Sequence, residues 1–294
     1  MTAGPPPTIL VFGDSLAFHG PSAAETVTDD RLWPNVAASA LGARADVVAR
    51  LGWLTRDGWW AMTKDAYVYS VLLPRADAVV LALGTMDHLP ASVPSYLREG
   101  IAYLRPGRLR RGVREAYLRV HPLGVRAWRG RLRMLPQRAS DSYLTRSVRA
   151  LRALFPGLPL IGIVPAPFAA CSNYPLTTTH LPAVEAARAW GHREGVQLLD
   201  LHAVAAPHFE RRSHNPDGLH WSWELHAEVG AELARLLARV WADLPGPGRG
   251  AAPGTWESGP SVRSRSWLPV PAAPGDRLSF RPTVAADVRG GYPS

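Results

Sequence analysis

Cysteine is almost absent from this chain of 294 residues, in which Cys171 is the only one. A single cysteine excludes an internal disulfide bond and a zinc site built on cysteines, and we expect no metal site and no bound cofactor. Lysine is equally scarce, so arginine carries almost all of the positive charge. The sequence also lacks internal repeats and a glycine-rich phosphate loop. Any chemistry must therefore come from ordinary side chains.

Long apolar runs are missing as well. The first apolar run ends at Phe12 and is far too short for a signal peptide or a membrane helix, and no basic residue precedes Arg31. We therefore expect a cytoplasmic protein. The hydrophobic content of 47% is enough for a full core.

The net charge of +9 is concentrated in one segment. Residues 105–138 hold eleven arginines and one acid, Glu115, so the rest of the chain is close to neutral. A local basic patch suits a polyanionic substrate or an anionic membrane surface, or has no specific partner. We do not expect nucleic-acid binding, and the sequence leaves the oligomeric state open.

The first apolar run stops abruptly at Gly13 and is followed by Asp14 and Ser15. A run with little alternation suits a buried strand of a parallel sheet. A serine that directly follows such a strand lies at the carboxyl edge of the sheet, where open α/β folds place their sites. This is the position that a nucleophile requires, although a plain turn is the alternative.

Strands and helices alternate along the chain, which predicts a three-layer α/β/α sandwich with a parallel five-stranded sheet. We expect strands near 9–12, 47–51, 78–83, 158–164 and 196–201, and helices near 30–41, 55–65, 92–104, 141–155, 181–194 and 221–241. From Pro245 onward the chain is rich in proline and glycine, so we divide it into a catalytic domain, 1–244, and a disordered tail, 245–294.

A second polar cluster, Asp217 to His220, precedes the last predicted helix. An Asp three residues before a His on a tight turn can accept the Nδ1 proton, which leaves Nε2 free to take the proton of a serine. We therefore expect Ser15, Asp217 and His220 to form a catalytic triad. His19, His88 and His226 are weaker candidates for the base.

Acyl transfer also needs donors for the oxyanion. We expect the backbone N–H groups of Ser15 and Gly52 to supply them, because glycine in the loop after the second strand allows close approach of substrate. An ordinary turn glycine is the alternative for Gly52.

Four blocks of the sequence resemble the SGNH, or GDSL, hydrolase superfamily: 13–16, Gly52, 84–87 and 217–220. The resemblance covers roughly residues 8–241 and implies a flavodoxin-like fold with Ser15 as nucleophile, His220 as base and Asp217 as its orienter. The third block has Met86 where the superfamily has an oxyanion-donating Asn, so this oxyanion hole has two backbone donors or borrows a third.

A narrower resemblance rests on the stretches 11–16, 31–35, 50–53, 56–60, 84–87 and 215–221, together with the basic segment. These stretches resemble those of the diglucosylglycerate octanoyltransferases, a family of SGNH-type acyltransferases of methylglucose lipopolysaccharide synthesis. The resemblance implies transfer of octanoyl from octanoyl-CoA to a glucosyl hydroxyl of diglucosylglycerate, with esterase activity as a side reaction.

Several side chains fit such substrates. Trp33, Trp53, Trp59 and Trp60 can stack on sugar rings, although core packing is the alternative for each. Asp87 can bind sugar hydroxyls or cap a helix. The guanidinium groups that can hold a glycerate carboxylate, or else remain solvated, are those of Arg50 and Arg56.

The basic segment, broken by Pro122 and Gly124, predicts two short amphipathic helices that cover the site as a lid. Its arginines, among them Arg108, Arg110 and Arg111, suit CoA phosphates, and its apolar residues suit an acyl chain. A membrane-surface helix and a solvated basic face remain alternatives. The rival functions are a carbohydrate esterase and a non-enzymatic binder of nucleic acid or anionic lipid.

Overall fold

The computed structural model describes residues 5–243, so the predicted tail, 245–294, lies outside the described residues. A parallel sheet of five strands runs through this part of the chain, in the order β2-β1-β3-β4-β5. The strands are β1 (Thr8–Gly13), β2 (Arg44–Ala49), β3 (Ala78–Ala82), β4 (Leu160–Val164) and β5 (Gln197–Asp200). The predicted α/β/α fold is confirmed.

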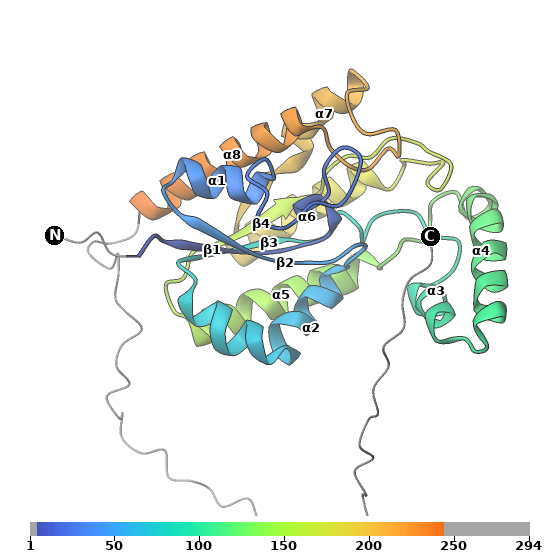
Figure 1. Cartoon of the computed structure of the whole chain (residues 1–294), viewed down its shortest axis with the longest axis horizontal. Coiled ribbons are helices and arrows are strands. Elements are labelled where there is room, and N and C mark those ends of the chain that lie inside the picture. The colour runs from blue at the N-terminus through green and yellow to red at the C-terminus, as the bar shows by residue number, and fades with distance from the viewer. Residues whose placement is uncertain (1–4, 244–294) are drawn as a thin grey trace, which may run out of the picture. The chain divides into compact units, whose positions relative to one another are not determined.

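Helices cover both faces of the sheet (Figure 1). One face carries α1 (Trp33–Ala40), α7 (Leu201–Glu210) and α8 (Trp223–Ala242), and the other carries α2 (Thr55–Lys64), α5 (Gln137–Leu154) and α6 (His180–Glu194). Two further helices, α3 (Ser95–Gly100) and α4 (Gly107–Ala127), lie outside these layers. None of the helices in residues 5–243 is long and apolar enough to cross a membrane.

The two-sided cover explains why β1 is apolar at every position. Ile9 and Val11 belong to the core beneath α1 and α8, whereas Leu10 and Phe12 belong to the core beneath α2 and α5. Successive side chains of a strand point to opposite faces, so a strand buried on both sides shows no polar alternation.

The strand order indicates where on the sheet a binding site can form. The chain moves from β1 outward to β2 and then crosses back to β3, on the other side of β1. Loops that leave β1 and β3 therefore separate at the carboxyl edge, where open α/β sheets form their binding crevices. Ser15 follows β1 and Asp87 follows β3, so both predicted blocks lie at this switch point.

The basic segment does not form two short helices, which corrects that prediction. Helix α4 continues through Pro122 and Gly124 for 21 residues. Its C-terminal end is docked on the loop after β3: a Cβ at Gly124 would lie 2.6 Å from the Ser92 Cβ, and the Ser92 Oγ is 2.8 Å from His121 Nδ1. These tertiary contacts outweigh the loss of one backbone hydrogen bond at the proline.

Other boundaries also differ from the predictions. The second strand begins three residues earlier than expected because its residues 44–49 pair with β1. The helix expected over 92–104 begins only after Pro94 and ends in a 3₁₀ turn, Ile101–Tyr103. Helix α7 was not predicted; it starts directly at the end of β5, where the Asp200 side chain accepts a hydrogen bond from the Ala203 N–H.

Candidate active site

Ser15 opens a 3₁₀ turn, Ser15–Ala17, immediately after β1. The turn is capped by Asp14, whose Oδ1 accepts a hydrogen bond of 2.9 Å from the Leu16 N–H. The other oxygen of Asp14, Oδ2, is buried and has no hydrogen-bond partner among the described residues. Burial raises the pKa of Asp14 to about 7, against the hydrogen bond from Leu16, which lowers it.

The structure brings the three predicted triad residues together. The Nε2 of His220 lies 3.0 Å from the Ser15 Oγ, and its Nδ1 lies 2.5 Å from the Asp217 Oδ2. The Asp217 Oδ1 accepts hydrogen bonds from the backbone N–H groups of Leu219 and His220 at 2.8 and 3.0 Å. The turn therefore fixes the carboxylate, and the carboxylate orients the imidazole.

The electrostatics keep the pair ready for base chemistry. Burial lowers the pKa of His220 below its usual value, against the hydrogen bond and charge of Asp217, which raise it. The pKa of Asp217 lies below its usual value. Partial burial alone would raise it, but the hydrogen bonds from His220 and from two backbone N–H groups together outweigh burial. At neutral pH the carboxylate is charged and the imidazole is neutral, which leaves Nε2 able to accept a proton.

The two expected oxyanion donors lie in the loops after neighbouring strands. Strands β1 and β2 pair in register up to Gly13 and Ala49, so Ser15 and Gly52 both follow at the same edge. Gly52 has φ +70° in a turn closed by the Trp53 N–H and the Arg50 carbonyl, a conformation that favours glycine. Neither the Ser15 nor the Gly52 N–H donates a backbone hydrogen bond within the described residues.

Two of the other histidines lie close to the triad. The ring of His19 stacks on that of His220, with centroids 3.6 Å apart and 15° between the planes. His226 is fully buried, receives the Trp33 N–H on Nδ1 at 3.3 Å, and places Nε2 3.1 Å from the His19 carbonyl oxygen. His226 therefore supports the backbone around the site and is not positioned as the base.

Trp33 does not reach any solvent-accessible site, which corrects its predicted role in sugar binding. Its side chain is 1% exposed, and Nε1 donates a hydrogen bond of 2.9 Å to the Leu16 carbonyl. The indole thus fills the core beneath the serine turn and uses its only donor there.

Asp87 is also a buried residue, which corrects its predicted contact with sugar hydroxyls. Its carboxylate accepts hydrogen bonds from the Thr55 N–H at 3.0 Å, from the Thr55 Oγ1 at 2.7 Å and from the Ser140 Oγ at 2.5 Å. Burial raises the pKa of Asp87, against these hydrogen bonds, which lower it. The residue therefore links the loop after β3 to the start of α2 and to α5.

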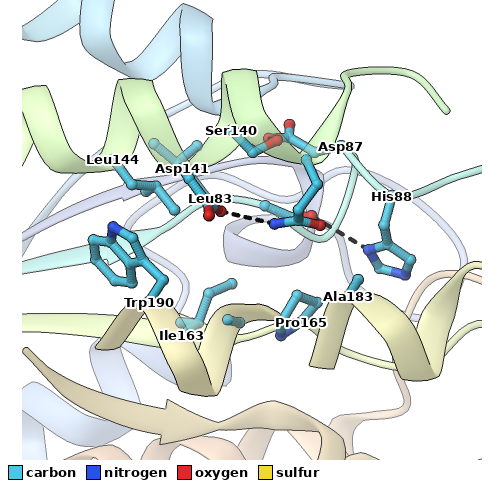
Figure 2. A pocket seen from close by; sticks show the side chains of 13 residues that line it. Leu83, Asp87, His88, Ser140, Asp141, Leu144, Ile163, Pro165, Ala183 and Trp190 are labelled. Atoms are coloured by element: carbon cyan, nitrogen blue, oxygen red, sulfur yellow. Dashed lines mark hydrogen bonds between the residues drawn. The ribbon is translucent and has the colours of Figure 1, made fainter. Parts of the chain in front are cut away.

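A small cavity beside Asp87 and His88 is shown in Figure 2. Its volume of about 20 Å³ is enough for one water molecule and far too small for a sugar or an acyl chain. His88 is buried, with Nδ1 3.3 Å from the Gly84 carbonyl and Nε2 3.4 Å from His180 Nδ1. This weaker base candidate is therefore enclosed in the fold and does not face Ser15.

A wider groove lies between the end of β2 and helix α2. Its volume is about 480 Å³, and it brings together three predicted substrate residues, Arg50, Trp53 and Trp60. The groove also contains Asp57 and Tyr67, which the sequence analysis did not single out. No motif marked them, because Asp57 on α2 and Tyr67, three residues beyond its end, reach the groove only through the packing of this segment against the sheet edge.

The other substrate candidates do not line this groove. Trp59 is half-buried on α2. The Arg56 guanidinium forms ion pairs with Asp57 at 3.1 Å and Glu99 at 2.8 Å and lies over the Trp60 ring. Its charge is therefore already balanced, which corrects its predicted use for a glycerate carboxylate. The three arginines expected to hold CoA, Arg108, Arg110 and Arg111, are exposed at the N-terminal end of α4.

Met86 lies in an apolar cluster next to the triad. It packs against the buried cluster that contains Leu54 and Phe168, and so does Leu219, the residue before His220. The end of the basic segment joins the same cluster, since the Met134 N–H donates to the Leu89 carbonyl at 2.9 Å. This side of the site is therefore apolar, and a thioether occupies the place of a polar donor.

Solved structures of esterases and lipases share this fold. A carbohydrate acetylesterase family member from Sinorhizobium meliloti matches with a TM-score of 0.54 and 16% identity, over 80% of this chain and 99% of that one. A lipase/acylhydrolase from Enterococcus faecalis matches with a TM-score of 0.51 and 17% identity, over 79% and 95%. At such identities the likeness shows the fold alone.

Relatives at higher identity come from mycobacteria. The chain is 37% identical over 242 residues to the diglucosylglycerate octanoyltransferase of Mycolicibacterium hassiacum, covering 81% of this chain and 98% of that protein. It is also 37% identical over 234 residues to the protein of the same name from Mycobacterium tuberculosis, covering 80% and 93%. The model of the GDSL-like lipase/acylhydrolase family matches residues 11–228. This chain belongs to the GDSL-like lipase/acylhydrolase family.

Proposed function

We propose that this protein is an O-acyltransferase that moves an octanoyl group from octanoyl-CoA to a glucosyl hydroxyl of diglucosylglycerate through an acyl-serine intermediate. The observation that carries the proposal is the 37% identity to enzymes named diglucosylglycerate octanoyltransferase, which extends over 98% and 93% of their lengths. The stretch that the family model matches, 11–228, contains Ser15, Asp217 and His220. Because acyl-CoA is the donor, we also propose that the enzyme acts in the cytoplasm.

In the first half-reaction His220 is the general base. Its Nε2, 3.0 Å from the Ser15 Oγ, takes the hydroxyl proton as the oxygen attacks the thioester carbonyl. The tetrahedral intermediate collapses when the C–S bond breaks, and the imidazolium returns the proton to the leaving thiolate. Asp217 stabilises the imidazolium through its contact with Nδ1.

In the second half-reaction a sugar hydroxyl takes the place of CoA. His220 removes its proton while the hydroxyl oxygen attacks the acyl-serine, and the proton then returns to the Ser15 Oγ. In both halves the free N–H groups of Ser15 and Gly52 are the oxyanion donors, because the Met86 thioether has no proton to donate.

The groove at the end of β2 is the proposed acceptor site. Trp53 and Trp60 offer indole faces for glucosyl rings, and Arg50 offers a guanidinium for the glycerate carboxylate. The apolar cluster around Met86 and Leu219 is the proposed surface for the octanoyl chain. In this proposal the acceptor and the acyl chain bind to separate surfaces, as transfer between two substrates requires.

The test is to mix the protein with octanoyl-CoA and to measure the mass of the intact chain and the products. We expect an octanoyl adduct on the wild-type protein and none on Ser15→Ala. Adding diglucosylglycerate should convert the adduct to acylated sugar faster than water converts it to octanoate. Release of octanoate alone, at a rate that the acceptor does not change, would identify an esterase instead.

A further inference from the structure

Helix α4 carries an exposed row of apolar side chains that the proposed reaction does not use. Leu109, Val120 and Leu123 are 50%, 56% and 62% exposed, and the alanines at 116 and 127 continue the row. At about 100° per residue these positions fall within roughly 60° of one another on the helix. The row is therefore a continuous apolar stripe along α4.

A row of arginines runs beside this stripe. Arg108, Arg119 and Arg126 lie within about a quarter of a turn of it, and all three are exposed. Among the described residues only Arg119 of the three has an ion pair, at 3.9 Å to Glu115 of the same helix. The exposed surface of α4 is thus both apolar and strongly basic.

The stripe is not the side on which α4 packs. The packed side is formed by Tyr117, His121 and Val125, of which His121 bonds to Ser92 and Val125 is fully buried. In Figure 1 the helix lies outside the three layers of the sandwich, next to α3. The stripe is therefore available to a partner while α4 stays docked.

We propose that α4 docks on an anionic phospholipid surface, with its apolar stripe at the boundary of the acyl chains and its arginines on the phosphates. A basic amphipathic helix whose apolar stripe carries leucine and valine has the composition that such a surface binds. This inference is independent of the proposed acyl transfer.

Charge complementarity favours an anionic lipid surface over the other possible partners of the stripe. A second copy of the chain would bring its own arginine row against the first, which is repulsive. Residues 245–294 hold six arginines and three acids, so the net charge of this segment is positive and does not complement that of α4. An anionic lipid surface supplies both the negative charge and the apolar layer.

The experiment is co-sedimentation of the full chain with vesicles of phosphatidylcholine alone or with 30% phosphatidylglycerol, at about 0.1 and 0.5 M salt. We expect binding to the anionic vesicles, weakened by salt. The variant Val120→Glu/Leu123→Glu should bind about tenfold more weakly. The control Leu154→Glu/Leu181→Glu changes two exposed leucines on other helices and should bind like wild type.

The melting temperature serves as the fold control and should be equal in all three proteins, because the four substituted side chains are exposed. The proposal is overturned if the wild type does not bind anionic vesicles at low salt, or if both double variants lose binding equally. It is also overturned if binding survives Val120→Glu/Leu123→Glu and is displaced by a short RNA, which would mean that the arginines bind polyanions without the stripe.

Discussion

The imidazole of His19 stacks on the imidazole of His220 at a centroid distance of 3.6 Å, and the two rings lie 15° from parallel. His19 belongs to the loop after the serine turn, and its Nδ1 is 2.6 Å from the Gly20 carbonyl oxygen. The stacked ring therefore limits how far His220 can rotate away from Ser15. It also adds a repulsive contribution that lowers the pKa of His220.

We expect His19→Ala to lower kcat/KM two- to tenfold, because aromatic pairs contribute about 0.5–1.5 kcal/mol. His220 must be neutral to act as base, so kcat/KM rises with pH, with a midpoint below the ordinary histidine value. The midpoint should move upward in His19→Ala. His19→Phe keeps a ring without a charge and should retain the rate while showing the same shift. A pH–rate profile of His19→Ala that superimposes on the wild type would refute this role.

Asp217→Asn should lower kcat by about 10³- to 10⁴-fold, because an amide cannot hold the Nδ1 proton as a carboxylate does. The Asn oxygen can still accept the backbone N–H groups of Leu219 and His220, so the turn should remain. The measurements are the rate of CoA release and the melting temperature. A large fall in melting temperature would show that the variant loses activity through the fold.

Substitutions of Trp33 and Trp60 should affect different properties, namely stability for Trp33 and acceptor binding for Trp60. Trp60→Ala removes an exposed wall of the groove and should raise the KM for the sugar acceptor severalfold with little change in melting temperature. Trp33→Phe deletes the bond to the Leu16 carbonyl and should cost about 1–3 kcal/mol of unfolding free energy. Equal acceptor KM values in Trp60→Ala and wild type would remove the groove from the acceptor site.

Asp14 should make stability depend on pH. The pKa of Asp14 is about 7 in the folded protein against 3.8 for an ordinary aspartate, so the folded state holds a proton that the unfolded state releases between these values. This contribution is complete below the lower value and is lost as pH rises through about 7. We therefore expect the stability of wild type relative to Asp14→Asn to fall between pH 4 and 7, measured by denaturant melts. A difference that is constant with pH would mean that Asp14 is ionised throughout.

The fold and the location of the site follow from local patterns in the sequence. The side chains of the apolar run 9–12 are all buried only if helices cover both faces of the sheet. The abrupt end of the run at Gly13 identifies Ser15 as a residue at the end of a strand. The spacing of Asp217 and His220 is local, since a turn of four residues brings the two side chains together wherever it lies. Such local patterns can be interpreted without knowing what packs around them.

Which polar and aromatic residues reach solvent depends instead on how distant segments pack together. Trp33 and Trp60 look alike in sequence, but Trp33 packs in the core with α8 beneath the serine turn, whereas Trp60 is on an exposed side of α2 and lines a groove. Asp87 is enclosed because Ser140, 53 positions away, lies against it. The burial of a side chain depends on contacts between distant segments, so it cannot be predicted from a local sequence pattern. The stacking of His19 on His220 is such a contact as well.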